Sequence, residues 1–191
     1  KKRMWAASWQ NINFNELGIK LRFFERPSSE FYSKFYSELF IRYGSFEDLP
    51  LSWRNEKANT AKEISYAIKK SESVLSYGCG LGAIEKTIVS MREDCKLDAF
   101  DFTDKSSKWL SEVNGVNCIN SLKDSKNYDF VYFSQLMYAM NDYEIGEMLL
   151  MLKEKLATNG RLLTVDTSLN LLENGDTHNL GTLKLSLKNL L

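Results

Sequence analysis

Three glycines at alternating positions mark the stretch of this sequence whose residue types are most suited to bind a ligand. The segment "VLSYGCGLGAIEK", residues 74–86, places Gly78, Gly80 and Gly82 after a short apolar run and before a helix-like pattern. Because glycine has no Cβ, such a turn lets a ligand lie against the main chain, and the helix that follows presents unpaired N–H groups. A tight turn without a ligand explains one glycine better than three. We therefore expect a ligand site here.

An acidic residue follows the glycines at the distance that is typical of a nucleotide-binding fold. Asp101 ends the next apolar run, about 20 residues after Gly82. The ends of neighbouring parallel strands lie side by side, so this carboxylate is able to accept two hydrogen bonds from a ribose diol. Taken alone, Asp101 is equally compatible with a solvated strand end. The pair of features is more specific, and it predicts a ligand that contains a ribose.

Short apolar runs that alternate with helix-like segments surround these residues. Helical spacing predicts helices over residues 83–92, through Trp109 to Val113, and over 143–157. Such an alternation implies right-handed crossovers between parallel strands. The predicted fold class is α/β: a Rossmann-like, doubly wound, mainly parallel sheet of at least five strands. The five runs that predict strands are residues 73–77, 97–102, 116–119, 128–133 and 161–166.

A helical, aromatic-rich segment precedes the predicted sheet. Phe31, Phe35, Leu39 and Tyr43 recur every four residues, and a second helix is expected over residues 55–70. We interpret the aromatic stripe as a face packed on the core, with a lid over the ligand or an interface as alternatives. We divide the chain into a helical N-terminal segment (1–70) and a ligand-binding domain (71–191). Few residues follow the fifth run, so the C-terminal edge of that domain is expected to be incomplete.

Composition narrows the function classes. The 191 residues contain 25 Lys and Arg and 25 Asp and Glu, and this neutral balance argues against a nucleic-acid partner. The three cysteines lack CxxC spacing, which argues against a disulfide framework or a metal site and favours a cytoplasmic location. No apolar run approaches the roughly 20 residues of a transmembrane helix.

Four segments, in this order, resemble the class I S-adenosylmethionine-dependent methyltransferases. The resemblance spans Ser71 to about Thr167, and it implies S-adenosylmethionine as cofactor and S-adenosylhomocysteine as product. The segments are "VLSYGCGLG", "DAFDFTDKSSKWL", "NYDFVYFSQLMYAMNDYE" and "LKEKLATNGRLLTVD".

The resemblance implies a cofactor contact for eleven residues. There are two departures from the family pattern: Ser76 stands where the family commonly has Asp or Glu, and Asn120 replaces a frequent Asp. One contact to the amino group of the cofactor is therefore expected to be lost or made through water. The implied contacts are Tyr77, Gly78, Cys79, Gly80 and Gly82 for the methionine part, Asp101 for the ribose, Phe102 for the adenine, Asn120 or Ser121 for the adenine amino edge, and Ser134 and Gln135 near the sulfonium.

No residue is assigned as catalytic, because methyl transfer depends largely on holding the acceptor in line. His178, Tyr138 and Tyr143 are candidate bases, with a polar loop or packing as the simpler interpretation. Arg54 and Lys57 are candidates for the cofactor carboxylate, with solvated charges at a helix start as the simpler interpretation. Cys79 is expected to pack rather than to act as a nucleophile.

The acceptor is less defined than the cofactor. The segment "FSQL" lacks the Asn/Asp-Pro-Pro-Tyr signature of methylases that act on the amino groups of bases. Together with the neutral charge, this favours a small-molecule or carbohydrate acceptor, with oxygen weakly preferred over nitrogen.

Two other functions stay open. "GCGLGA" also fits the G-x-G-x-x-A pattern of a nicotinamide-dependent oxidoreductase, although no second mononucleotide-binding half is evident. A non-catalytic binding module with the same fold is the other alternative, because a fold does not fix a function.

Overall fold

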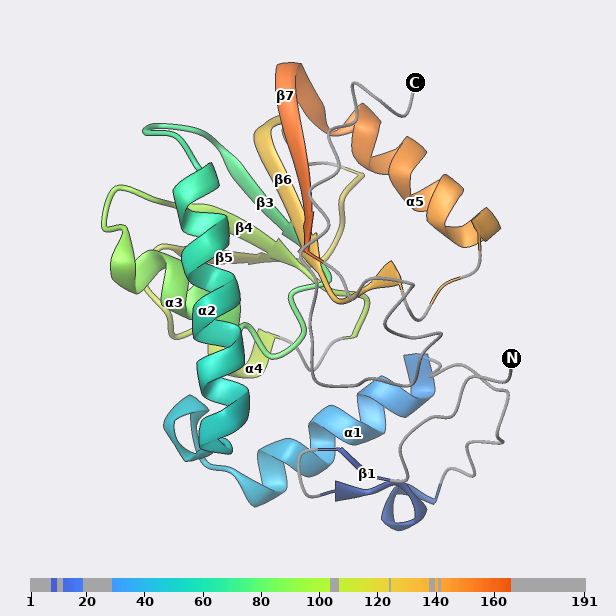
Figure 1. Cartoon of the computed structure of the whole chain (residues 1–191). Helices are drawn as coiled ribbons and strands as arrows, with labels where there is room; N and C mark the ends of the chain where they lie inside the picture. Colours follow the sequence, from blue (N-terminus) through green and yellow to red (C-terminus); the bar gives the residue numbers. More distant parts are fainter. Residues whose placement is uncertain are drawn as a thin grey trace, which may run out of the picture.

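A sheet of five strands forms the centre of the protein, as Figure 1 shows for the computed structural model. The strands lie in the order β5-β4-β3-β6-β7, and every neighbouring pair is parallel. Each strand corresponds to one of the five apolar runs, so the predicted fold class is confirmed. The strands are β3 (Val74–Tyr77), β4 (Leu97–Phe100), β5 (Val116–Ile119), β6 (Tyr128–Ser134) and β7 (Leu156–Val165).

The structure describes the chain in several stretches. Tyr138, His178 and the C-terminal edge after Val165 lie outside them, so the expectations for those parts stay predictions. The described residues are 8–9, 12–18, 29–103, 107–123, 125–137, 140 and 142–165.

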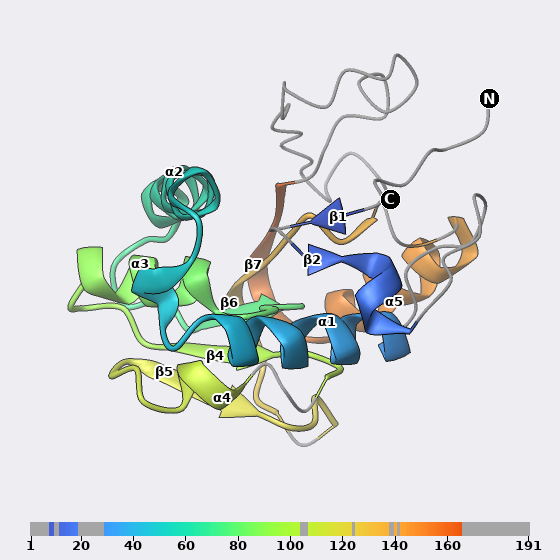
Figure 2. The same ribbon diagram turned by 90° about the horizontal axis from the view of Figure 1, so that it is seen from below.

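Helices cover both faces of the sheet, which confirms the doubly wound arrangement (Figures 1 and 2). On one face, Ile64 and Ile88 from two helices belong to the same buried cluster as Val74 of β3. On the other face, Met148 packs with Leu75 of the same strand. No helix in the described stretches is long and apolar enough to cross a membrane. The first face carries α2 (Leu51–Ala67), α3 (Ala83–Met91) and the short α4 (Ser107–Leu110), and the second carries α5 (Asp142–Glu154).

The N-terminal helix runs across the carboxyl-terminal edge of the sheet (Figure 2). Its predicted apolar face is buried: Phe35 and Leu39 are fully enclosed and belong to one cluster with Leu81 of the glycine loop. The prediction that this stripe packs on the core is therefore confirmed. The elements of this region are β1 (Ser8–Trp9), β2 (Ile12–Asn13), the 3₁₀ turn Phe14–Leu17, α1 (Ser29–Arg42) and the 3₁₀ turn Phe46–Asp48.

The last helix and the last strand differ from the predicted bounds. The helix expected to reach residue 157 ends at Glu154, and the strand expected from Arg161 begins at Leu156. The sequence Asn159-Gly160 indicated a turn between them. Instead it lies inside β7, where the register with β6 shifts, and this irregularity accommodates the positive φ of Asn159.

One further expectation about helices is wrong. The helix expected through Val113 is a single turn that ends at Leu110, and the chain then turns at Gly115, whose φ is +90°, to enter β5.

Close packing behind the glycine loop generates a stability prediction. Gly82 has a φ of +83°, and a Cβ there would lie 2.0 Å from Leu110. We expect Gly82→Ala to lower the free energy of unfolding by roughly 2–5 kcal/mol through backbone strain and overpacking, as measured by urea denaturation.

Gly146 in α5 provides the matched control. A Cβ there would meet nothing within 4 Å, so Gly146→Ala should raise stability by about 0.5–1 kcal/mol. Equal stability of Gly82→Ala and the wild type would contradict the packing described here.

Candidate functional site

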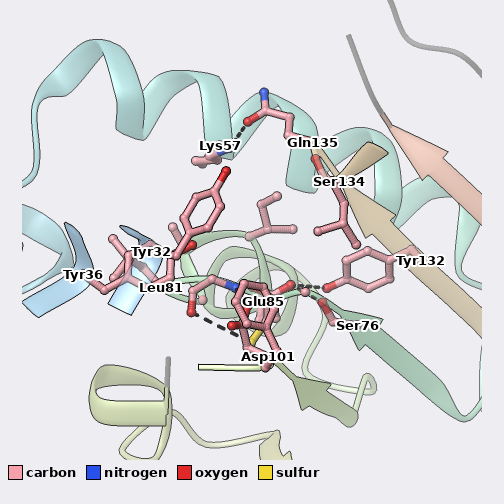
Figure 3. Close-up of a pocket in the computed structure, with 18 of the residues that line it drawn as sticks. Tyr32, Tyr36, Lys57, Ser76, Leu81, Glu85, Asp101, Tyr132, Ser134 and Gln135 are labelled. Atoms are coloured by element: carbon pink, nitrogen blue, oxygen red, sulfur yellow. Dashed lines mark hydrogen bonds between the residues drawn. The ribbon is translucent and has the colours of Figure 1, made fainter. Parts of the chain in front are cut away.

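A pocket opens where β3, β4 and β6 end, between the glycine loop and the helices α1 and α2 (Figure 3). The space inside it, counted to its open mouth and including open solvent, is about 780 Å³. Ligands bind at this edge of open α/β sheets. Eight of the residues predicted from the sequence line it: Gly78, Cys79, Gly80, Gly82, Asp101, Phe102, Ser134 and Gln135.

Hydrogen bonds anchor the glycine loop to the end of β4. The N–H groups of Gly78 and Cys79 both donate to the carbonyl of Phe100, at 2.7 and 3.1 Å. The N–H of Gly80 donates to Oδ2 of Asp101 at 2.8 Å, and the other oxygen of that carboxylate accepts from the N–H and the hydroxyl of Thr103. Asp101 thus shapes the loop. Among the described residues, Oδ2 accepts only the hydrogen bond from Gly80 and has a second lone pair, so Asp101 retains acceptor capacity toward the pocket.

Three of the predicted contacts lie outside the pocket lining. Tyr77 stacks on Phe100, with 5.5 Å between the ring centroids, on the face of the sheet that α5 covers, and burial raises its pKa. Asn120 and Ser121 are exposed after β5, the edge strand, and the hydroxyl of Ser121 accepts from the N–H of Lys123 at 3.1 Å. The structure therefore does not bring these three residues together with the other eight, and their cofactor contacts stay predictions.

A buried carboxylate lies beneath the glycine loop. Glu85, on the first turn of α3, is 1% exposed, and its Oε1 accepts from the hydroxyl of Ser76 at 2.6 Å and from that of Tyr132 at 2.8 Å. Burial raises the pKa of Glu85, although both hydrogen bonds act in the opposite direction. Its Oε2 is buried and has no partner among the described residues.

Glu85 was not among the residues predicted for the site, although the sequence contains a signal for its burial. Leu81, Ile84, Glu85 and Ile88 stand at the i, i+3, i+4, i+7 spacing of one helix face. An acid inside such an apolar stripe is expected to be buried, and a buried carboxylate needs hydrogen-bond partners.

A lysine forms part of the opposite wall. Lys57 of α2 is 13% exposed at its side chain, and its Nζ donates to Oε1 of Gln135 at 2.6 Å and lies 3.8 Å from Glu56. Nε2 of Gln135 in turn donates to the Glu56 carboxylate at 2.6 Å. Burial lowers the pKa of Lys57, and the neighbouring carboxylates of Glu56 and Glu85 oppose this effect. The interpretation of Lys57 as a solvated charge is therefore wrong.

Aromatic side chains from α1 cover the loop. The hydroxyl of Tyr36 would lie 2.8 Å from a Cβ at Gly80, and the ring of Tyr32 meets that of Phe102 edge-on at 6.2 Å between centroids. Phe102 is 52% exposed, which leaves part of its ring open to a ligand. The helix α1 therefore lines the pocket as well as packing on the core.

The remaining polar groups limit the chemistry of the pocket. Burial raises the pKa of the Cys79 thiol well above its usual range, which keeps the thiol protonated and unsuited to act as a nucleophile. The hydroxyl of Ser134 is buried without a partner among the described residues. No group of three or more potential metal ligands occurs within the described stretches.

No protein-family model and no curated protein sequence matches the chain. Solved structures do match it. The DhpI-SAM-HEP complex matches 78% of this chain and 70% of that chain at 16% identity, with a TM-score of 0.56. The glycopeptide N-methyltransferase MtfA complexed with (S)-adenosyl-L-methionine matches 59% of this chain and 56% of that chain at 15% identity, with a TM-score of 0.52.

The chain has the fold of the S-adenosylmethionine-dependent methyltransferases. It spans 34%, 66% and 55% of the lengths of the coclaurine N-methyltransferase, DhpI and MtfA structures that it matches.

The raised pKa of Glu85 generates a prediction for the protein without ligand. The folded state holds the Glu85 proton more tightly than the unfolded state, whose ordinary pKa is 4.5. The stability that this proton contributes is complete below about pH 4.5 and is lost as the pH rises through the folded-state pKa. We expect Glu85→Gln, a neutral residue of the same shape, to remove this loss and to raise the free energy of unfolding at neutral pH.

Urea denaturation at several pH values between about 4.5 and 8 measures the effect. The exposed Glu63 of α2 supplies the control, since Glu63→Gln makes the same change in net charge. If both variants follow the pH dependence of the wild type, Glu85 is not a destabilising buried charge.

Proposed function

We propose that this chain is an S-adenosylmethionine-dependent methyltransferase that acts on a small-molecule or carbohydrate acceptor. The observation that carries the proposal is the pocket itself, which combines an anchored glycine loop with Asp101 at the adjacent strand end. Glu85 and Ser134 line the same pocket, and each has one buried polar atom, Oε2 and the hydroxyl respectively, without a partner in the described part of the chain. These features fit a ligand that carries a ribose and polar hydrogen-bond donors.

In this proposal, different residues of the pocket contact different parts of the ligand. The glycine loop holds the methionine part, Asp101 accepts hydrogen bonds from the ribose hydroxyls, and the open ring of Phe102 packs on the adenine. When bound, the cofactor supplies an activated methyl group on a positively charged sulfur. Ser134 and Gln135, at the end of β6, lie on the side of the pocket where the acceptor would approach.

In this proposal, the described residues of the pocket contribute orientation rather than a strong base. In favourable model systems, positioning alone accounts for about 7–11 kcal/mol of a barrier. We propose the segment 1–70 as the acceptor-side cap, because Tyr32 and Tyr36 of α1 close the pocket above the loop. These rings would exclude water from the reacting atoms and shape the acceptor site.

The acceptor atom is the least constrained part of the proposal. An oxygen acceptor remains our expectation from the sequence, while the name of MtfA states that it is an N-methyltransferase. An assay of labelled methyl transfer therefore needs panels of both hydroxyl and amine compounds as acceptors. Cofactor binding without transfer to any acceptor would instead support a non-catalytic binding module.

Calorimetric titration with S-adenosylhomocysteine tests the proposal. We expect binding near micromolar, about −8 kcal/mol, and none with NAD or NADP. Asp101→Ala should weaken binding about 10-fold or more, because it removes both the ribose acceptor and the anchor of Gly80.

Asp94→Ala is the control for the loss of one negative charge, since Asp94 pairs with Arg92 in the turn that follows α3. This variant should bind like the wild type. A wild-type protein that fails to bind S-adenosylhomocysteine, or that prefers a nicotinamide cofactor, would contradict the proposed function.

A further inference from the structure

One carboxylate oxygen in the pocket is left without the partners that its burial demands. Both hydroxyl groups that bond to Glu85 donate to the same oxygen, Oε1. Oε2 is equally buried and has no hydrogen-bond partner within the described part of the chain. An unsatisfied buried acceptor destabilises the protein, and more so if it is charged. A ligand that donates to Oε2 would remove this cost.

Glu85 belongs to the pocket lining and stands on the first turn of α3, the helix that follows the glycine loop. Figure 3 shows its side chain with Ser76 and Tyr132 on one side of it. All three residues line the pocket. The ligand group that reaches Oε2 therefore lies next to the loop.

The charges around Glu85 favour an ammonium group over a hydroxyl or an amide. Lys57 is the cation that acts on Glu85 through the pocket, but its Nζ is held by Gln135 and Glu56. No ion pair joins Lys57 to Glu85 in the described stretches. The pocket thus holds a buried acid and a buried base that form no ion pair with each other, an arrangement that suits a zwitterion such as an α-amino acid group.

We propose that Glu85 binds the α-amino group of the methionine part of the cofactor, with Lys57 facing the carboxylate of the same group. This inference rests on the proposed function and adds a residue from α3 to the binding site. Ser76 on β3 has a short side chain that is buried and donates a hydrogen bond to Glu85. The carboxylate of Glu85 on α3 therefore reaches the end of β3, where the family commonly has an acidic residue. The contact expected to be lost at Ser76 is made by Glu85.

The test compares two ligands that differ in the amino acid end. S-adenosylhomocysteine carries the α-amino acid group, whereas 5′-methylthioadenosine has the same adenosine and a thioether but no amino acid group. We expect Glu85→Gln to weaken the binding of S-adenosylhomocysteine about 10-fold or more, since a charge-assisted hydrogen bond is lost. The affinity for 5′-methylthioadenosine should stay within about two-fold of the wild-type value. Glu63→Gln, the exposed control, should change neither affinity.

The pH dependence of binding gives a second measurement. Protonation of Glu85 removes the charge that attracts the ammonium group, so wild-type affinity for S-adenosylhomocysteine should fall as the pH is lowered through the range in which Glu85 titrates. The affinity for 5′-methylthioadenosine, and the affinities of Glu85→Gln, should lack this dependence. A thermal melt of each variant establishes that it is folded before titration.

The outcomes separate this inference from the proposed function. If a folded Glu85→Gln protein binds both ligands more weakly by the same factor, or binds S-adenosylhomocysteine as the wild type does, the role of Glu85 is overturned. The cofactor site would stay in place in either case. A wild-type protein that binds neither ligand would overturn both.

Discussion

Three hydrogen bonds from consecutive loop residues to the end of β4 fix the geometry on which the rest of the site depends. The carbonyl of Phe100 and the carboxylate of Asp101 accept the N–H groups of Gly78, Cys79 and Gly80. They bring the loop against the neighbouring strand and determine where α3 begins, and therefore where Glu85 lies. Leu81, in the same loop, carries the contact to α1, so the roof of the pocket is also placed by this turn.

The buried charged residues of the pocket lower the stability of the protein without ligand, while they suit the binding of a charged ligand. Glu85 and Lys57 are both largely buried, and burial disfavours the charged form of each. In the protein without ligand, this is an unfavourable arrangement compared with neutral residues of the same shape. A site that binds a zwitterion requires both charges, because a neutral lining would leave the ligand charges desolvated and unpaired. Strained or destabilising groups of this kind concentrate at functional sites.

The sequence predicted the sheet and the loop well because strong physical signals encode them. Strands buried on both faces appear as continuous apolar runs, and positive φ at alternating positions demands glycine. The burial of Glu85 was not predicted, and Lys57 was named as a candidate for the cofactor carboxylate only beside the simpler interpretation of a solvated charge. A helical pattern assigns charged residues to solvent unless their partners are known. The partners of Lys57 come from α2 itself and from Gln135, 78 residues further along the chain. No local pattern connects such distant residues. The bounds of β7 were missed for a related reason, since Asn159-Gly160 indicates a turn until its pairing with β6 is seen.

A crystal structure of the protein with S-adenosylhomocysteine would locate every part of the ligand relative to the glycine loop. We expect the ribose hydroxyls on Asp101 and the α-amino group within hydrogen-bond distance of Oε2 of Glu85. A ligand bound outside this pocket, or one whose amino acid end points away from Glu85 and Lys57, would contradict the proposed cofactor site.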